Sequence, residues 1–213
     1  MTILQALIAF SIAAGLLTLT PGLDTALTLR TATIEGPKRA ALAVVGIAIG
    51  CLTWGAVVAL GLGALLKASL LAFTVLKWAG AAYLVWLGAN LVLRPRAGFN
   101  LEAAGGLDAS AAAAGDFTWM RRGLLTNLLN PKVGIFYISF LPQFLPQGVP
   151  AAPFIFLLAA VHAAIGSVWL GCLIAATRPI ARVLKRPAVV RWLDRITGAV
   201  FLGFGVRLAL SRR

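Results

Sequence analysis

An apolar stretch near the start of the chain reads ILQALIAFSIAAGLLTLTPGLDTALTLRTATI over residues 3–34. It is long enough to cross about 30 Å of hydrocarbon, but Thr20-Pro21-Gly22 interrupts it and Asp24 follows. A proline within a helix removes a backbone donor and clashes with the preceding turn, so we expect a break there. A second apolar stretch, residues 119–145, is interrupted at Asn130-Pro131. We therefore predict two broken spanning helices.

Four uninterrupted apolar segments accompany these two stretches, at residues 40–66, 69–93, 152–177 and 191–210. Over the 213 residues, 61% are hydrophobic and only 12% are charged, which lies far outside the composition of soluble domains. The chain is therefore predicted to be an all-α membrane protein of six transmembrane helices, with helices one and four broken at proline.

The one polar stretch of low complexity is predicted to divide the chain into halves. Residues 97–117 are rich in Ala and Gly and lack a helical apolar period, so we expect a flexible cytoplasmic linker. Residues 1–96 and 118–213 would then each form a three-helix repeat. Because three is odd, the second repeat would be inserted upside down, an arrangement that many secondary transporters share.

The charge pattern predicts the orientation in the membrane. The formal net charge is +13, and the basic residues cluster in alternate connections between apolar segments. Basic loops stay on the cytoplasmic side, so we expect a cytoplasmic (inner) membrane of bacterial type, with both termini outside the cytoplasm. The pattern lacks the aromatic-interleaved groove of nucleic-acid binders, so lipid is the expected surface partner and nucleic acid is not.

The first break has the order of a helix restart, in which Thr20 supplies a hydroxyl cap, Pro21 occupies the first position and Asp24 lies in the first turn. At the second break Asn130 would cap, Pro131 would occupy the first position and Lys132 follows. Backbone groups freed at membrane depth are tolerated only in protein or beside a wet cavity. We therefore expect both breaks to border one cavity.

Charges inside a membrane segment are costly and commonly mark a pathway. Asp24 would favour a cation and Lys132 an anion, and together they would match the ammonium and carboxylate of a zwitterion such as an amino acid. The alternative is that the two charges merely neutralise each other, or that one snorkels to an interface. The predicted substrate-binding residues are Thr20, Pro21, Gly22, Asp24, Asn127, Asn130, Pro131 and Lys132.

Histidine, cysteine and tryptophan residues also lie within the apolar segments. His162 is the single histidine, and with Asp24 it is a candidate for proton coupling, although a lone buried histidine is more often a packing residue. No metal site is expected, because no second histidine or cysteine is near it. Cys51 and Cys172 are expected to be apolar filler away from the breaks, and Trp169 a packing or interfacial residue. The role of Lys77 stays open.

Several stretches resemble the LysE/RhtB family of amino-acid exporters, and the match covers nearly the whole chain outside the linker. In the first half they are Leu19-Thr20-Pro21-Gly22-Leu23-Asp24, Gly36-Pro37-Lys38-Arg39-Ala40-Ala41-Leu42, Gly46-Ile47-Ala48-Ile49-Gly50 and Leu76-Lys77-Trp78-Ala79-Gly80. In the second half they are Asn127-Leu128-Leu129-Asn130-Pro131-Lys132 and Phe140-Leu141-Pro142-Gln143-Phe144. One departure is Leu23, where the family commonly has a second proline.

The resemblance implies a secondary transporter that exports amino acids or their derivatives, driven by the proton gradient, and needs no cofactor. Two alternatives from other classes are a six-helix membrane thiol-disulfide relay and an inorganic-ion exporter. No hydrolytic or transfer constellation is present in the sequence, so an enzyme is not expected. The oligomeric state is left open, a homo-oligomer included.

Overall fold

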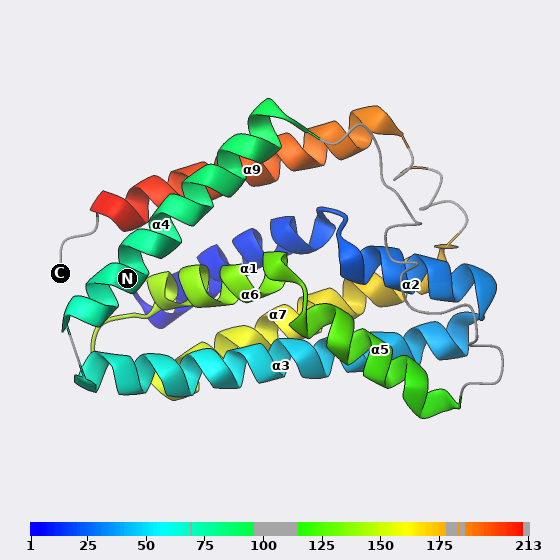
Figure 1. Ribbon diagram of the computed structural model, residues 1–213, viewed down its shortest axis with the longest axis horizontal. Coiled ribbons are helices and arrows are strands. Elements are labelled where there is room, and N and C mark those ends of the chain that lie inside the picture. Colours follow the sequence, from blue (N-terminus) through cyan, green and yellow to red (C-terminus); the bar gives the residue numbers. More distant parts are fainter. Residues whose placement is uncertain (69, 96–114, 178–182, 184–185, 211–213) are drawn as a thin grey trace.

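The computed structural model describes residues 1–68, 70–95, 115–177, 183 and 186–210, and helices are the regular elements of this part of the chain (Figure 1). The first interrupted stretch forms α1 (Ile3–Leu19) and α2 (Leu23–Ile34), bent by 53°. The second forms α5 (Asp116–Leu128), α6 (Pro131–Phe140) and the 3-10 helix η3 (Leu141–Phe144), with a bend of 55°. The predicted proline breaks are confirmed.

The unbroken helices are α3 (Pro37–Ala68), α4 (Leu70–Leu93), α7 (Ala151–Ala175) and α9 (Pro187–Leu210). Among the described residues, α3 and α7 are long and apolar enough to cross a membrane alone, and each bent pair could supply one further span. These two to four candidate spans confirm a multi-pass helical membrane protein. Six spans in two inverted repeats stay a prediction.

The predicted linker falls mostly outside the described residues, which omit 96–114. Its last two positions belong to α5, which begins at Asp116 rather than at the predicted residue 118. The two residues before Thr118 can join the helix because Gly115 provides an extended N-cap, and the Gly115 carbonyl accepts from the Thr118 amide at 3.0 Å.

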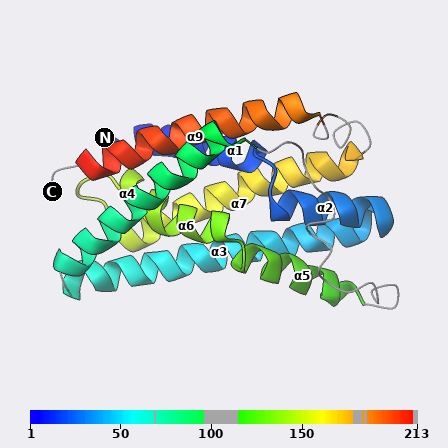
Figure 2. The ribbon, with the colours of Figure 1, turned by 45° about the horizontal axis from the view of Figure 1, so that its top comes forward.

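The helices lie roughly along one direction, with α1 and α6 between two layers (Figures 1 and 2). On one side α4 pairs with α9, and on the other α3 packs along both α5 and α7. Each bent pair therefore has its break in the middle of the bundle, between the two layers. This placement is what makes polar groups at the breaks costly unless they find partners.

Two glycines allow α3 and α5 to approach closely. A Cβ built on Gly46 would overlap the carbonyl of Met120, and one on Gly123 would overlap the carbonyl of Ala43. Small residues at such a contact let two backbones meet in van der Waals contact within a membrane. The α3–α5 contact therefore depends on glycine at both positions, and it holds the second break against the middle of α3.

Buried aromatic rings fill the bundle beyond the breaks, toward the end that holds η3. Phe136 and Phe140 of α6 stack at 4.8 Å between ring centroids, and Phe140 lies 4.4 Å from Phe204 of α9. Phe10 of α1 meets Phe144 of η3 edge-on at 5.4 Å. We call these five residues the aromatic plug. It lies between the breaks and this end of the bundle.

Basic residues gather at the opposite end, where α2 ends and α3 and α5 begin (Figure 1). Lys38 pairs with Asp116 at 2.7 Å, which ties the start of α3 to the start of α5. Arg122 lies 4.7 Å from the ring centre of the buried Trp119, within range of a cation–π contact. The two ends of the molecule therefore differ, one aromatic and one basic.

Candidate functional site

The first break differs from its prediction in detail. Thr20 is the C-cap of α1 and not the N-cap of α2, since its hydroxyl donates back to the Leu16 carbonyl at 2.9 Å and also contacts the hydroxyl of Thr197 on α9. Gly22 is the N-cap of α2, with an extended backbone and no capping side chain. Pro21 thus lies between the helices rather than in the first position of α2. Asp24 lies in the first turn of α2, as predicted.

The second break follows its prediction closely. Asn130 is the N-cap of α6, and its side-chain oxygen accepts from the backbone amide of Lys132 at 3.1 Å. Pro131 occupies the first turn of α6, where its missing donor is not needed. This cap fixes where α6 starts, and therefore where the Lys132 side chain leaves the helix.

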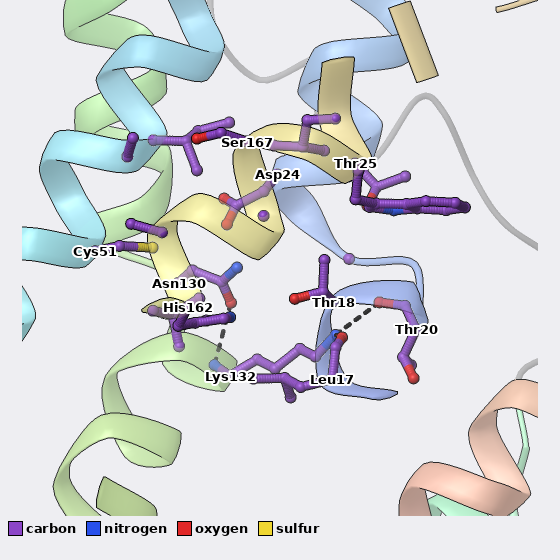
Figure 3. A pocket seen from close by; sticks show the side chains of 18 residues that line it. Leu17, Thr18, Thr20, Asp24, Thr25, Cys51, Asn130, Lys132, His162 and Ser167 are labelled. Carbon is purple, nitrogen blue, oxygen red and sulfur yellow. Dashed lines mark hydrogen bonds between the residues drawn. The ribbon is translucent and has the colours of Figure 1, made fainter. Parts of the chain in front are cut away.

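Two hydrogen-bonded ties join one break to the other (Figure 3 shows that of Lys132). The Lys132 ammonium donates to the carbonyl of Leu17 at 2.9 Å and to that of Thr20 at 2.7 Å. These carbonyls belong to the last turn of α1 and to its C-cap, where carbonyls have no partner within the helix. The Asn127 side-chain amide donates to the Asp24 carboxylate at 2.8 Å. A cation thus caps the end of α1, and an amide holds the carboxylate at the start of α2.

A cavity of about 60 Å³ lies between the breaks, α3 and α7. Its volume suffices for a few water molecules. The predicted residues on its wall are Thr20, Gly22, Asp24, Asn130, Lys132 and His162. Asn127 reaches it through Asp24, whereas Pro21 and Pro131 shape the breaks and do not line it. The structure therefore brings the predicted site residues together around one hollow.

His162 projects from the middle of α7 and is buried. Its Nδ1 atom lies 3.0 Å from the hydroxyl of Tyr137 on α6, and its ring is 5.4 Å from that of Phe136. The histidine therefore lies where the cavity meets the aromatic plug, with a titratable hydroxyl as its neighbour. Lys77 falls outside the residues whose side chains are described.

Several residues of the cavity wall were not assigned to it from the sequence, among them Cys51, Trp169 and Thr18. Cys51 of α3 was expected away from the breaks, but it is buried on the cavity wall, 3.5 Å from the Asn127 amide. Trp169 of α7 was expected to pack or to lie at an interface, and it too lines the cavity, as does Thr18 of α1. Which way Cys51 and Trp169 face depends on how α3 and α7 are rotated relative to the breaks, and the sequence of an almost uniformly apolar helix does not encode this rotation. Cys172 is exposed and does not line this cavity.

Three polar atoms from the cavity-lining residues are buried without a hydrogen-bond partner among the described residues. They are Oδ1 of Asp24, Oγ1 of Thr18 and Nε1 of Trp169. Buried polar atoms in native structures nearly always have a partner, so each such exception needs an explanation. A molecule in the cavity could therefore form hydrogen bonds with one carboxylate oxygen, one hydroxyl and one indole N–H group.

The chain matches the family model of the LysE type translocator over residues 16–212. This match spans both breaks and nearly the whole chain. The chain belongs to the LysE family. The resemblance read from the residues around the breaks is thereby confirmed, and the cavity belongs to a LysE-type translocator.

Named relatives agree with this membership. The translocator is 33% identical to the homoserine/homoserine lactone efflux protein of Salmonella typhi, with 96% of each chain covered. It is 32% identical to the leucine efflux protein of Klebsiella pneumoniae, over 95% of this chain and 93% of the relative. Identity to the threonine efflux protein of Salmonella typhi is 30%, over 91% and 92%. No solved structure matches.

Membership in the LysE family makes this chain a membrane transporter and not an enzyme. The geometry also gives no support to a thiol-disulfide relay. Such a relay needs two reactive thiols that can meet, yet Cys51 is buried beside Asn127 and Cys172 is exposed on α7.

Proposed function

We propose that this LysE-type translocator exports amino acids or amino-acid derivatives across the cytoplasmic membrane by alternating access. One observation carries the proposal: the two helix breaks meet at a cavity whose wall holds one carboxylate, Asp24, and one ammonium, Lys132. A zwitterion presents the complementary pair of charges. The printed names of relatives support this substrate class, because homoserine, leucine and threonine all carry an ammonium beside a carboxylate.

The ammonium of the substrate would bind Asp24. One carboxylate oxygen already accepts from Asn127, and the other has no partner among the described residues. A charge-assisted hydrogen bond to that oxygen would satisfy it. Asn127 would keep the carboxylate aimed at the cavity while the substrate enters and leaves.

The carboxylate of the substrate would bind Lys132. This ammonium caps α1 through the carbonyls of Leu17 and Thr20, and a carboxylate is a stronger acceptor than a carbonyl. Substrate binding would therefore draw Lys132 from the end of α1. Releasing that contact loosens the tie between the two breaks, which gives binding a direct means of changing the conformation.

The halves that move would be two inverted three-helix repeats, residues 1–96 and 118–213, joined by the linker 97–117. The six spans would be α1–α2, α3 and α4 in the first repeat, and α5–α6, α7 and α9 in the second. Support comes from the bends of 53° and 55°, which open the two repeats at corresponding places.

We place the basic end of the bundle in the cytoplasm, following the positive-inside rule. The aromatic plug then lies on the outer side of the cavity, and both termini lie outside the cytoplasm. An exporter must admit substrate from the basic end and release it past the plug. We therefore propose that Phe10, Phe136 and Phe140 separate during the outward step.

Proton coupling would run through Asp24 or His162. Both line the cavity, and both come from elements that would move relative to each other, α2 and α7. Titratable groups at membrane depth are the usual carriers of a coupled proton. Tyr137, 3.0 Å from His162, would hold the imidazole in a fixed orientation.

A counterflow screen in proteoliposomes tests the proposal. Purified protein is reconstituted with a high internal concentration of one amino acid at a time, and uptake of the labelled compound is followed. We expect counterflow for a subset of amino acids that carry a free amino group. Absence of counterflow for every amino acid, from protein that is inserted and thermally stable, would overturn the proposed function.

A further inference from the structure

Trp169 lines the cavity although its side chain carries no charge. Its indole nitrogen is buried and has no acceptor among the described residues, although the ring lines the cavity. The ring also packs against the apolar cluster of Leu29, Val44, Ile47, Leu170 and Leu173. These residues come from α2, α3 and α7, so the half-buried ring packs on a cluster to which three helices contribute. A donor in such a setting is prepositioned for a ligand.

The other unpartnered atoms of the wall define what this ligand must offer. Oδ1 of Asp24 can only accept while it is ionised, and Nε1 of Trp169 can only donate. Oγ1 of Thr18 can do either. A ligand that satisfies all three carries a donor and an acceptor within the short span of a cavity of about 60 Å³. The α-ammonium and α-carboxylate of an amino acid are two such groups on one carbon.

We propose that Trp169 is a substrate-binding residue whose indole N–H donates a hydrogen bond to the carboxylate of the exported amino acid. This proposal rests on the proposed export of amino acids and names a further residue of the same site. A carboxylate has several acceptor positions, so Trp169 and Lys132 can bind it together. Lys132 would attract the carboxylate by its charge, and the hydrogen bond from Trp169 would orient the carboxylate in the cavity.

The alternative explanation is that water satisfies the indole nitrogen and the other atoms. In that case loss of the N–H would leave substrate affinity unchanged. If instead the ring only packs against its neighbours, its replacement would affect all ligands alike. The two alternatives therefore differ from the proposal in measurable ways.

The test replaces Trp169 by Phe, which removes the donor and keeps an aromatic ring. Trp54→Phe is the matched control, because its Nε1 is also buried without a partner among the described residues, yet Trp54 does not line this cavity. The counterflow substrate found by the screen is used, with leucine, threonine and homoserine as first probes. We expect W169F to raise KM about tenfold or more, as for loss of a donor to a charged acceptor, and W54F to leave KM unchanged.

Competition by an analogue separates a hydrogen bond from packing. The competitor is the primary amine that lacks only the carboxylate of the transported amino acid. In the wild-type protein the amine should compete at least tenfold more weakly than the amino acid. In W169F this difference should shrink by the same factor by which KM rises. If W169F does not insert, equal competition by the amine and the amino acid in the wild-type protein would still overturn the proposal.

Three results would overturn the proposal while leaving export intact: an unchanged KM in W169F, an equal rise in W54F, or equal competition by the amine and the amino acid in the wild-type protein. Absence of counterflow in the wild-type protein is a different outcome, because it removes the proposed function itself.

Discussion

Asn127 donates its side-chain amide to the carboxylate of Asp24 at 2.8 Å, although 103 positions separate the two residues in the chain. The bond joins the last turn of α5 to the first turn of α2. It lies in the middle of the bundle, beside the cavity that Asp24 lines. The second break therefore supplies donors, from Asn127 and Lys132, to acceptors at the first break, and hydrogen bonds join the two interrupted helices.

Replacing Asn127 by Ala should destabilise the protein. The Asp24 carboxylate would lose its hydrogen-bond donor while still buried, at a cost of about 1–3 kcal/mol. We expect a lower midpoint of thermal unfolding in detergent for N127A. Asn90→Ala, which alters a half-buried amide on α4, should have little effect. Equal midpoints for N127A and wild type would contradict the structural role of this bond.

Replacing Lys132 by Met should weaken both stability and export. Met keeps an apolar stem but donates nothing, so the carbonyls of Leu17 and Thr20 lose a charged donor, worth about 1.5–3 kcal/mol for such hydrogen bonds. Counterflow should fall at least tenfold, because the substrate carboxylate also loses its partner. The exposed Lys38→Met is the control for a loss of charge. Full counterflow in K132M would show that the substrate does not need this ammonium.

The close glycine contact between α3 and α5 predicts that a larger side chain there destabilises the protein. Gly123→Ala would place a methyl group against the carbonyl of Ala43, and overpacking of this kind costs about 1–3 kcal/mol. Gly171→Ala on α7 meets nothing within 4 Å and should be neutral. The measurement compares the midpoints of thermal unfolding of G123A and G171A, and we expect the lower midpoint for G123A. A G123A protein as stable as G171A would mean that α3 and α5 do not approach as closely as described.

Much of this site could be predicted from local sequence rules. Proline and its neighbours determine where a helix ends, and Asn130 caps α6 as that rule requires. The same rule failed at Thr20, because the hydroxyl of a threonine can bond back to the preceding turn as easily as it can cap the next helix. In the structure the same hydroxyl also contacts Thr197 of α9, and no local rule contains that contact.

Residues on the unbroken helices could not be assigned from the sequence. α7 is apolar around its whole circumference, so its sequence does not show which face carries Trp169 toward the cavity. The same holds for Cys51 on α3. That Lys132 favours an anion stays a prediction, and the sequence did not show that its ammonium caps α1 in this structure. Only the packed arrangement shows that carbonyls of another helix lie within its reach.

His162 should influence coupling more than binding. Gln at this position keeps a hydrogen-bonding group near Tyr137 but cannot carry a proton, so H162Q should exchange substrate in counterflow and fail to accumulate it against a gradient when a pH difference is imposed. The measurement compares counterflow with pH-driven uptake in the same proteoliposomes. Tyr137→Phe, which removes the hydroxyl next to the imidazole, should lower pH-driven uptake in the same direction. If H162Q accumulates substrate as the wild type does, the coupled proton does not use His162.

Equilibrium binding of the transported amino acid to purified protein tests most directly whether the cavity between the breaks is the substrate site. Asp24→Asn removes the charge that would hold the ammonium, and Asp116→Asn removes an exposed carboxylate at the basic end as the matched control. Scintillation-proximity binding of the labelled amino acid should give wild-type affinity for D116N and an affinity at least tenfold weaker for D24N. Equal affinities for D24N and wild type would contradict the assignment of this cavity as the substrate site.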